Sequence, residues 1–305
     1  MAPATDPASA ADPPAAEDAA VGIPRRARLH ATVIDHDPHR PKPRIAFCHG
    51  LFGQGKNWTA IAKQLADDYS VTLIDMPDHG RSPWTAELSY ELLADLVADF
   101  LRSSDPGGDG RDPGWTLVGH SMGGKIAMTL ALRHPELVRA LAVVDIAPVD
   151  YAGLSEFGRY VQGMRAVDLT TLRTRSQADD QLRDAVPDPG VRSFLLQNLR
   201  RSSESTGDEE GWHWQMNLQL LGDHLDVLAG WPDQSSRSYP GPTLWLAGAN
   251  SSYIKPEYAP AMRRMFPQVR LVKIKNASHW VHSDQPSVFT AVLRDFLRRT
   301  TGEVS

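Results

Sequence analysis

Short apolar runs and longer amphipathic stretches alternate along most of this chain. The short runs favour buried strands, expected at residues 29–35, 44–50, 71–75, 116–118, 140–148, 242–250 and 269–274. Between them, apolar residues recur at helical spacing, most clearly over 89–101 and 287–299. Strands that alternate with helices predict an α/β fold with a mostly parallel central sheet covered by helices on both faces.

The alternation stops after the strand that ends at Asp145. Residues 149–240 contain helical stretches rich in charged and aromatic residues, but no run typical of a buried strand. This segment is too long for a plain loop, and an insertion here reaches the carboxyl edge of the sheet, where ligands bind in open α/β sheets. We therefore expect a core of residues 25–148 and 241–300, with residues 149–240 forming a helical lid.

Composition narrows the class of protein further. Of the 305 residues 41% are hydrophobic, which suits a sizeable core, and the net charge of -5 gives no general attraction to nucleic acid. Residues 1–24 are mainly Ala, Pro and acidic residues without the features of a secretory signal, so a disordered tail is expected. Cys48 is the only cysteine, and no apolar stretch is long enough to span a bilayer. We expect a cytoplasmic monomer or homodimer that acts on small molecules.

A serine between two glycines follows the strand at 116–118. Residues 117–125 read LVGHSMGGK and a helical pattern begins at Lys125, so Ser121 lies on a strand-to-helix turn. Such a turn gives its central residue a positive φ and leaves no room for a Cβ at Gly119 and Gly123. The pattern predicts a nucleophile elbow, which holds a serine Oγ outside the sheet edge. An ordinary glycine-rich turn is the alternative.

An elbow serine needs a base, and His279 is the first candidate among eleven histidines. It lies in the stretch NASHWVHSDQP between the last strand and the last helix, where a chain order of serine, acid and histidine places the base. His282 remains the alternative. The HxxH spacing of these two residues does not predict a zinc site, because a third ligand at a suitable spacing is missing.

The base in turn needs a carboxylate that orients it. Many hydrolases of this shape carry that acid after the penultimate strand, but here residues 250–252 are an asparagine and two serines, and the first acid is Glu257. Asp145 closes an earlier strand, so its side chain emerges at the same sheet edge as the elbow. We predict that Asp145 orients the base, with Glu257 and Asp284 as alternatives.

Two backbone N–H groups are expected to form an oxyanion hole. Met122, directly after the nucleophile, supplies one of them. The loop HGLFG after an early strand bends toward the site, and we expect Leu51 to supply the other, with Phe52 as the alternative. His49 fits a role in bracing this loop, and Cys48 fits the core of the protein.

Aromatic residues could line an apolar pocket for the acyl group. The candidates are Phe52 and Trp280 beside the elbow, and Tyr151, Tyr160 and Trp214 in the expected lid. At helical spacing such residues can equally pack the lid itself, so both roles stay open for each of them.

Four motifs taken together, HGLFG, DxxxHGxS, GHSMGGK and VVDIAPVDY, resemble the α/β-hydrolase family and in particular its YbfF-like esterase branch. The likeness extends from about residue 45 to about residue 297 and includes WHWQMNL, GANSSYI and SHWVHSDQP. It implies a triad of Ser121, His279 and Asp145 that acts on carboxylic esters or acyl thioesters through an acyl-enzyme. It also implies that neither a metal nor an organic cofactor takes part.

Other functions use similar residues and stay open as alternatives. They are a carbon–carbon bond hydrolase, a cofactor-free perhydrolase and a non-catalytic ligand-binding member of the same fold. The first two usually carry their acid after the penultimate strand, which this chain does not. Epoxide hydrolases and dehalogenases of this fold need an aspartate at the elbow, so Ser121 excludes them.

Overall fold

A seven-stranded sheet forms the centre of the part of the chain that the structure, a computed structural model, describes: residues 28–104, 114–151, 155–202 and 211–302. Its order is β1 (Ala31–Ile34), β3 (Ser70–Ile74), β2 (Arg44–Cys48), β4 (Trp115–His120), β5 (Val138–Val144), β8 (Thr243–Gly248) and β9 (Val269–Ile274). The edge strand β1 pairs antiparallel with β3, and the other pairings in this sheet are parallel. The mostly parallel sheet predicted from the sequence is confirmed, while the expected tail at 1–24 lies outside the described residues.

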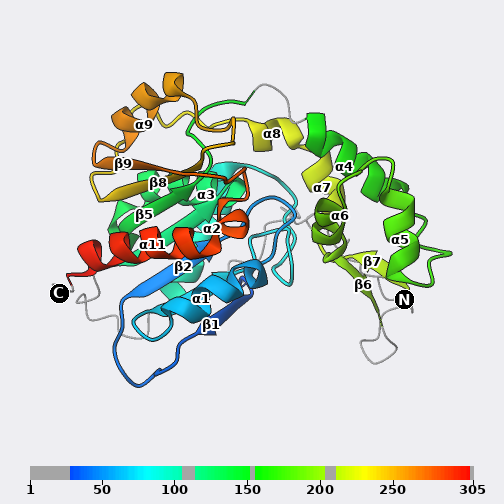
Figure 1. Cartoon of the computed structure of the whole chain (residues 1–305), viewed down its shortest axis with the longest axis horizontal. Coiled ribbons are helices and arrows are strands. Elements are labelled where there is room, and N and C mark those ends of the chain that lie inside the picture. Colours follow the sequence, from blue (N-terminus) through cyan, green and yellow to red (C-terminus); the bar gives the residue numbers. More distant parts are fainter. Residues whose placement is uncertain (1–27, 105–113, 152–154, 203–210, 303–305) are drawn as a thin grey trace, which may run out of the picture.

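Helices cover both faces of this sheet (Figure 1). One layer contains α2 (Tyr90–Ser103), α3 (Met122–Arg133) and α9 (Ala259–Met265), and the other contains α1 (Thr59–Leu65), α10 (Val281–Asp284) and α11 (Pro286–Thr301). Successive strand residues point to opposite faces, so Phe47 joins the core beneath α1 and α11 while Cys48 joins the core beneath α2 and α3. Short 3₁₀ turns lie at Gly55–Trp58, Pro135–Leu137 and Pro256–Tyr258.

The expected helices at 89–101 and 287–299 are α2 and α11, each with bounds within two residues of the prediction. The Ser89 hydroxyl caps α2 by accepting a hydrogen bond of 3.1 Å from the Leu92 N–H. Within the described ranges, every helix is too short or too polar to cross a membrane.

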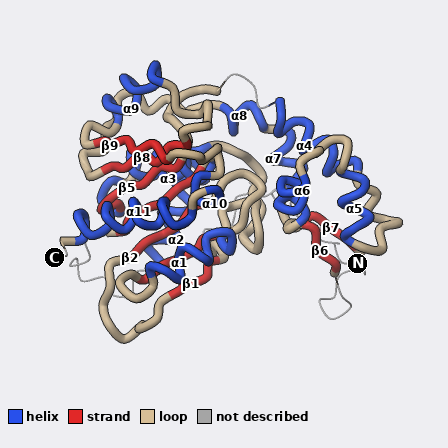
Figure 2. The backbone as a smooth tube through the Cα atoms, viewed as in Figure 1, coloured by secondary structure: helices blue, strands red, loops and turns tan. Residues whose placement is uncertain are grey.

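Between β5 and β8 the chain leaves the sheet and forms the inserted segment, residues 149–240. Its elements are α4 (Ser155–Ala166), α5 (Arg175–Leu182), α6 (Pro189–Leu196), β6 (Leu199–Arg201), β7 (Trp212–Trp214), α7 (Leu218–Asp223) and α8 (Leu225–Ala229). Figures 1 and 2 show these elements gathered at one end of the sheet, with α8 nearest to the core.

The prediction of helices alone in this segment was wrong in one respect. Strands β6 and β7 pair antiparallel, with Leu199 opposite Trp214, and both side chains are buried. The two strands are three residues each, too short for their alternation to stand out in the sequence.

Candidate active site

Ser121 occupies a sharp turn between β4 and α3. Its φ of 53° and ψ of -122° lie in a region of backbone angles that residues other than glycine rarely adopt. Its N–H donates to Val144 O at 3.1 Å. A Cβ added to Gly119 would lie 2.4 Å from Gly123 O, and one added to Gly123 would lie 2.4 Å from Cys48 O. The turn therefore requires residues without a Cβ on both sides of the serine, as the sequence pattern predicts.

His279 lies in the loop between β9 and α10, and its ring contacts the carboxylate that follows β5. Its Nδ1–H donates to Asp145 Oδ2 at 2.9 Å, which leaves Nε2 as the ring nitrogen that can accept a proton. Nε2 is buried and has no hydrogen-bond partner among the described residues. The main-chain oxygen of His279 accepts a hydrogen bond from His120 Nε2 at 2.9 Å, which connects this loop to the residue before Ser121. Ser121 and His279 line the same pocket.

Asp145 follows β5 directly, with a φ of 51° and a fully buried side chain. Its Oδ1 accepts from the Gly248 N–H at 2.9 Å, and its Oδ2 accepts from the Ser251 hydroxyl as well as from His279. The last residue of β8 and the loop after it, which lacks a carboxylate, thus each supply one donor to the carboxylate of Asp145.

Sequence reasoning did not assign a role to Ser251. The signal lay in the loop itself, because a serine stands where the usual acid is missing and its hydroxyl can donate to an acid that comes from another strand. The alternative acids are placed differently. Asp284 accepts from the N–H and hydroxyl of Ser278, and Glu257 lies on the surface.

The competing base, His282, stacks on Trp58 with ring centroids 4.1 Å apart. Burial lowers its pKa to about 3, with a smaller contribution from the neighbouring His279. His49 accepts from the Met76 N–H at 2.9 Å, and its Nδ1–H donates to Gly50 O at 2.8 Å. Both contacts hold the loop after β2, as expected for a bracing residue.

Cys48 is fully buried, and burial raises the pKa of its thiol to about 12. Such a thiol stays protonated near neutral pH and behaves as part of the core. Within the described residues, no group of three or more His, Cys, Asp or Glu side chains is arranged to hold a metal ion.

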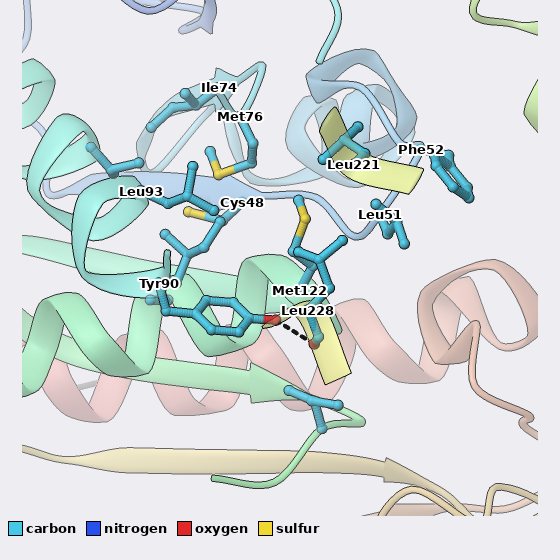
Figure 3. Packing of buried hydrophobic residues seen from close by; sticks show 14 of the residues in the cluster. Cys48, Leu51, Phe52, Ile74, Met76, Tyr90, Leu93, Met122, Leu221 and Leu228 are labelled. Carbon is cyan, nitrogen blue, oxygen red and sulfur yellow. Dashed lines mark hydrogen bonds between the residues drawn. The ribbon is translucent and has the colours of Figure 1, made fainter. Parts of the chain in front are cut away.

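The two residues expected to supply oxyanion donors lie close to Ser121. Leu51 and Met122 line one cavity together with Ser121, and Figure 3 shows them approaching from the loop after β2 and from α3. Phe52 has a positive φ of 62°, and its N–H donates to His79 Nε2 at 3.1 Å. The Phe52 N–H is thus already engaged in a hydrogen bond, and Leu51 stays the predicted second donor.

Two cavities meet at Ser121. The larger encloses about 540 Å³, open solvent at its mouth included, and lies between core residues and the side chains of α4 and α6. The smaller, of about 340 Å³, lies between α3 and the ends of the inserted segment. Both share Leu51, Ser121 and Phe157.

The predicted substrate-binding residues divide between these cavities. Phe52, Trp280 and Tyr160 line the larger one, and Tyr151 lines the smaller one. Trp214 lines neither of the two; its indole N–H donates to Met164 O at 3.2 Å inside the inserted segment. This bond packs Trp214 within the segment, and its part in a substrate pocket stays a prediction.

Parallel sheet, elbow and histidine loop together define a class of protein. A family model described as the alpha/beta hydrolase fold matches residues 43–286. The chain therefore belongs to the α/β-hydrolase family.

The relatives place the chain within the YbfF-like esterase branch of this family. The sn-1-specific diacylglycerol lipase ABHD11 of Mus musculus is 40% identical and covers 84% of this chain and 81% of its own. The esterase YbfF of Escherichia coli (strain K12) is 31% identical, covering 85% of this chain and 94% of its own. A solved structure titled marine microorganism esterase superposes with a TM-score of 0.80 at 30% identity, over 89% of this chain and 100% of that one.

Proposed function

We propose that this chain is a serine hydrolase that cleaves carboxylic esters or acyl thioesters through a Ser121, His279 and Asp145 triad. The coarser assignment, a carboxylesterase-type hydrolase, follows from the family and from relatives named esterase or lipase. One observation supports the triad above all. His279 donates to the buried Asp145 through Nδ1, while its Nε2 is unpartnered in a pocket that Ser121 also lines.

In the proposed reaction, His279 Nε2 takes the proton of Ser121 Oγ as the oxygen attacks the acyl carbonyl. Asp145 holds the tautomer that has its proton on Nδ1 and stabilises the imidazolium that forms. Collapse of the tetrahedral intermediate expels the alcohol or thiol, which receives the proton from Nε2 and leaves an acyl-enzyme. Water, deprotonated by the same nitrogen, then releases the carboxylic acid.

The N–H groups of Met122 and Leu51 are the proposed donors to the oxyanion. Met122 begins a helix, so its N–H has no intrahelical acceptor, and the dipole of the helix favours negative charge at this end. Loss of one such donor typically costs about a hundredfold in rate.

We propose that the larger cavity takes the acyl chain and that the inserted segment acts as its lid. Apolar side chains from α4 and α6, among them Phe157, Val191 and Phe194, face core residues such as Trp280 across this cavity. An apolar cavity of this kind suits the acyl part of a lipid-like ester, in keeping with the relative named a diacylglycerol lipase.

A fluorophosphonate probe and a panel of p-nitrophenyl esters and acyl thioesters test this proposal. We expect covalent labelling of wild-type Ser121 and hydrolysis across the panel, and at least a roughly 10,000-fold loss of kcat/KM in Ser121→Ala. Ser103→Ala, which removes a serine hydroxyl on exposed α2 surface, serves as the control and should keep both. A wild-type protein that folds but neither labels nor turns over any substrate would favour a ligand-binding role instead.

A further inference from the structure

The two points at which the chain passes between the core and the inserted segment lie against each other. The Tyr151 N–H donates to Ala229 O at 3.0 Å, and the Trp231 N–H donates to Asp150 Oδ1 at 2.6 Å. Residues 149–151 lead into the segment and residues 228–231 lead out of it. We call these two stretches the neck.

Two buried side chains of the core hold the outgoing stretch of the neck. The Tyr90 hydroxyl of α2 donates to Leu228 O at 2.8 Å, a contact drawn in Figure 3. Lys125 Nζ of α3 donates to Ala229 O at 2.7 Å and also to Gly230 O. Three successive carbonyls at the end of α8, which a helix cannot satisfy itself, thus receive donors from the core.

Lys125 is unusual because only 1% of it is exposed to solvent. Its ammonium lies between the rings of Tyr90 and Tyr151, 5.5 and 5.0 Å from their centroids. Burial lowers the pKa of Lys125 to about 7, and the carboxylate of Asp150 acts in the opposite direction. Either form of the amine has enough N–H groups to serve both carbonyls. Burying an amine without hydrogen-bond acceptors costs free energy, so the Ala229 and Gly230 carbonyls are what make a buried lysine tolerable here.

The same lysine belongs to the turn that carries the nucleophile. Lys125 lies in the first turn of α3, and its backbone N–H donates to Ser121 O at 3.0 Å. On the other side, the Tyr151 hydroxyl donates to Tyr253 O at 2.8 Å, and the Tyr253 ring stacks on His279 with centroids 3.9 Å apart. The neck therefore contacts side chains next to both the serine and the histidine.

We propose that Lys125 is a positioning residue that fixes the neck on α3, and thereby fixes the wall of the larger cavity formed by the inserted segment relative to Ser121. The effect on catalysis rests on the proposed function, whereas the fixing of the neck does not. We call the two hydrogen bonds from Lys125 to Ala229 O and Gly230 O the clamp. Without the clamp, α4 and α6 should be free to shift over the larger cavity. Binding of a long acyl chain, which uses that wall, should then suffer more than the chemical step.

Lys125→Met tests this inference because it keeps the length of the side chain and removes its donors. We expect backbone amides of 149–151 and 228–231 to exchange hydrogen at least about tenfold faster than in the wild type. We expect the KM for p-nitrophenyl hexanoate to rise about tenfold while kcat and the KM for p-nitrophenyl acetate change less than about threefold. Tyr90→Phe, which removes one donor to Leu228 O, should give the same changes at smaller size. The exposed Lys63→Met should give neither.

A folded Lys125→Met protein with unchanged neck exchange, or with a lower melting temperature but the same dependence of KM on chain length, would overturn the inference. Should Lys125→Met fail to fold, unchanged exchange and KM values in Tyr90→Phe would overturn it instead. A wild type without turnover would count against the proposed function alone, since faster neck exchange in the variants would still support the clamp.

Discussion

The core and the inserted segment are built in different ways. In the core, alternate residues of each strand enter one of two apolar clusters, such as Phe47 in one and Cys48 in the other. The described residues of the inserted segment that belong to an apolar cluster, by contrast, all belong to the one beneath α2 and α3. The strand ends of the core fix where the proposed catalytic groups lie. The segment extends only one of the two apolar clusters and forms one wall of the larger cavity.

This difference suggests a division of labour that mutations can test. Substitutions at the strand ends of the core should act on turnover. Substitutions on the cavity wall of the inserted segment should act on the choice of substrate, and those inside the segment should have little effect on either.

The largest effect in the core after loss of the nucleophile is expected for Asp145→Asn. An asparagine amide can keep much of the shape but cannot hold His279 in the tautomer with its proton on Nδ1, so kcat should fall by about 10³- to 10⁴-fold. Steady-state kinetics with a p-nitrophenyl ester measures this fall. Asp99→Asn, at a largely exposed position of α2, is the matched control. If Asp145→Asn kept activity within tenfold of the wild type, another residue would have to orient His279. Loss of activity in Glu257→Gln would then identify Glu257 as that acid.

Acid should unfold the core through histidines that are buried in neutral form. Burial lowers the pKa of His49 to about 3, with a smaller contribution from His79, whereas a histidine in the unfolded chain titrates near its usual 6.5. Below pH 6.5 the unfolded state therefore binds more protons than the folded state, and the free energy of unfolding falls as the pH drops toward 3. His49 alone can lower the free energy of unfolding by a few kcal/mol between pH 7 and pH 4.

Denaturant unfolding at pH 7 and pH 4 measures this contribution in His49→Gln. The variant has less stability to lose on acidification, whatever its stability at pH 7, so the difference between the two pH values should shrink by a few kcal/mol. His213→Gln, at an exposed position of the inserted segment, should leave the difference unchanged. An equal pH dependence in all three proteins would show that His49 does not carry it.

The same division explains what the sequence could and could not predict. Asp145 and Ser121 were predictable because both follow apolar runs whose ends must meet at one edge of a parallel sheet. Two other contacts could not be predicted, because no local pattern connects the residues that make them. They are the strand pairing of Leu199 with Trp214 and the hydrogen bond from Ser251 to Asp145. Local periodicity tells which face of an element is apolar, but not which distant residue will cover it. For the same reason the sequence left both packing and pocket lining open for Trp214.

Val191→Phe tests the cavity wall formed by the inserted segment. Val191 lies on α6 and lines the larger cavity, so a phenyl ring there should take up space that a long acyl chain needs. We expect the ratio of kcat/KM for hexanoate to that for acetate to fall about tenfold, because lost or added methylene contacts change discrimination on this scale. Val288→Phe, at a position of α11 that is 46% exposed, should leave the ratio unchanged. An unaltered ratio in Val191→Phe would place the acyl chain in the smaller cavity.

The smallest effect is expected inside the inserted segment, for Trp214→Phe. The substitution removes the indole N–H that donates to Met164 O, and a neutral hydrogen bond of this kind contributes about 1 kcal/mol to the free energy of unfolding. Neither cavity loses a wall residue, so kcat/KM for acetate and hexanoate esters should stay within about twofold of the wild type. Denaturant unfolding and the two-ester assay measure the two quantities. A change in chain-length preference as large as that of Val191→Phe would contradict the proposed division of labour. Residues packed inside the segment would then control substrate choice as strongly as residues on the cavity wall.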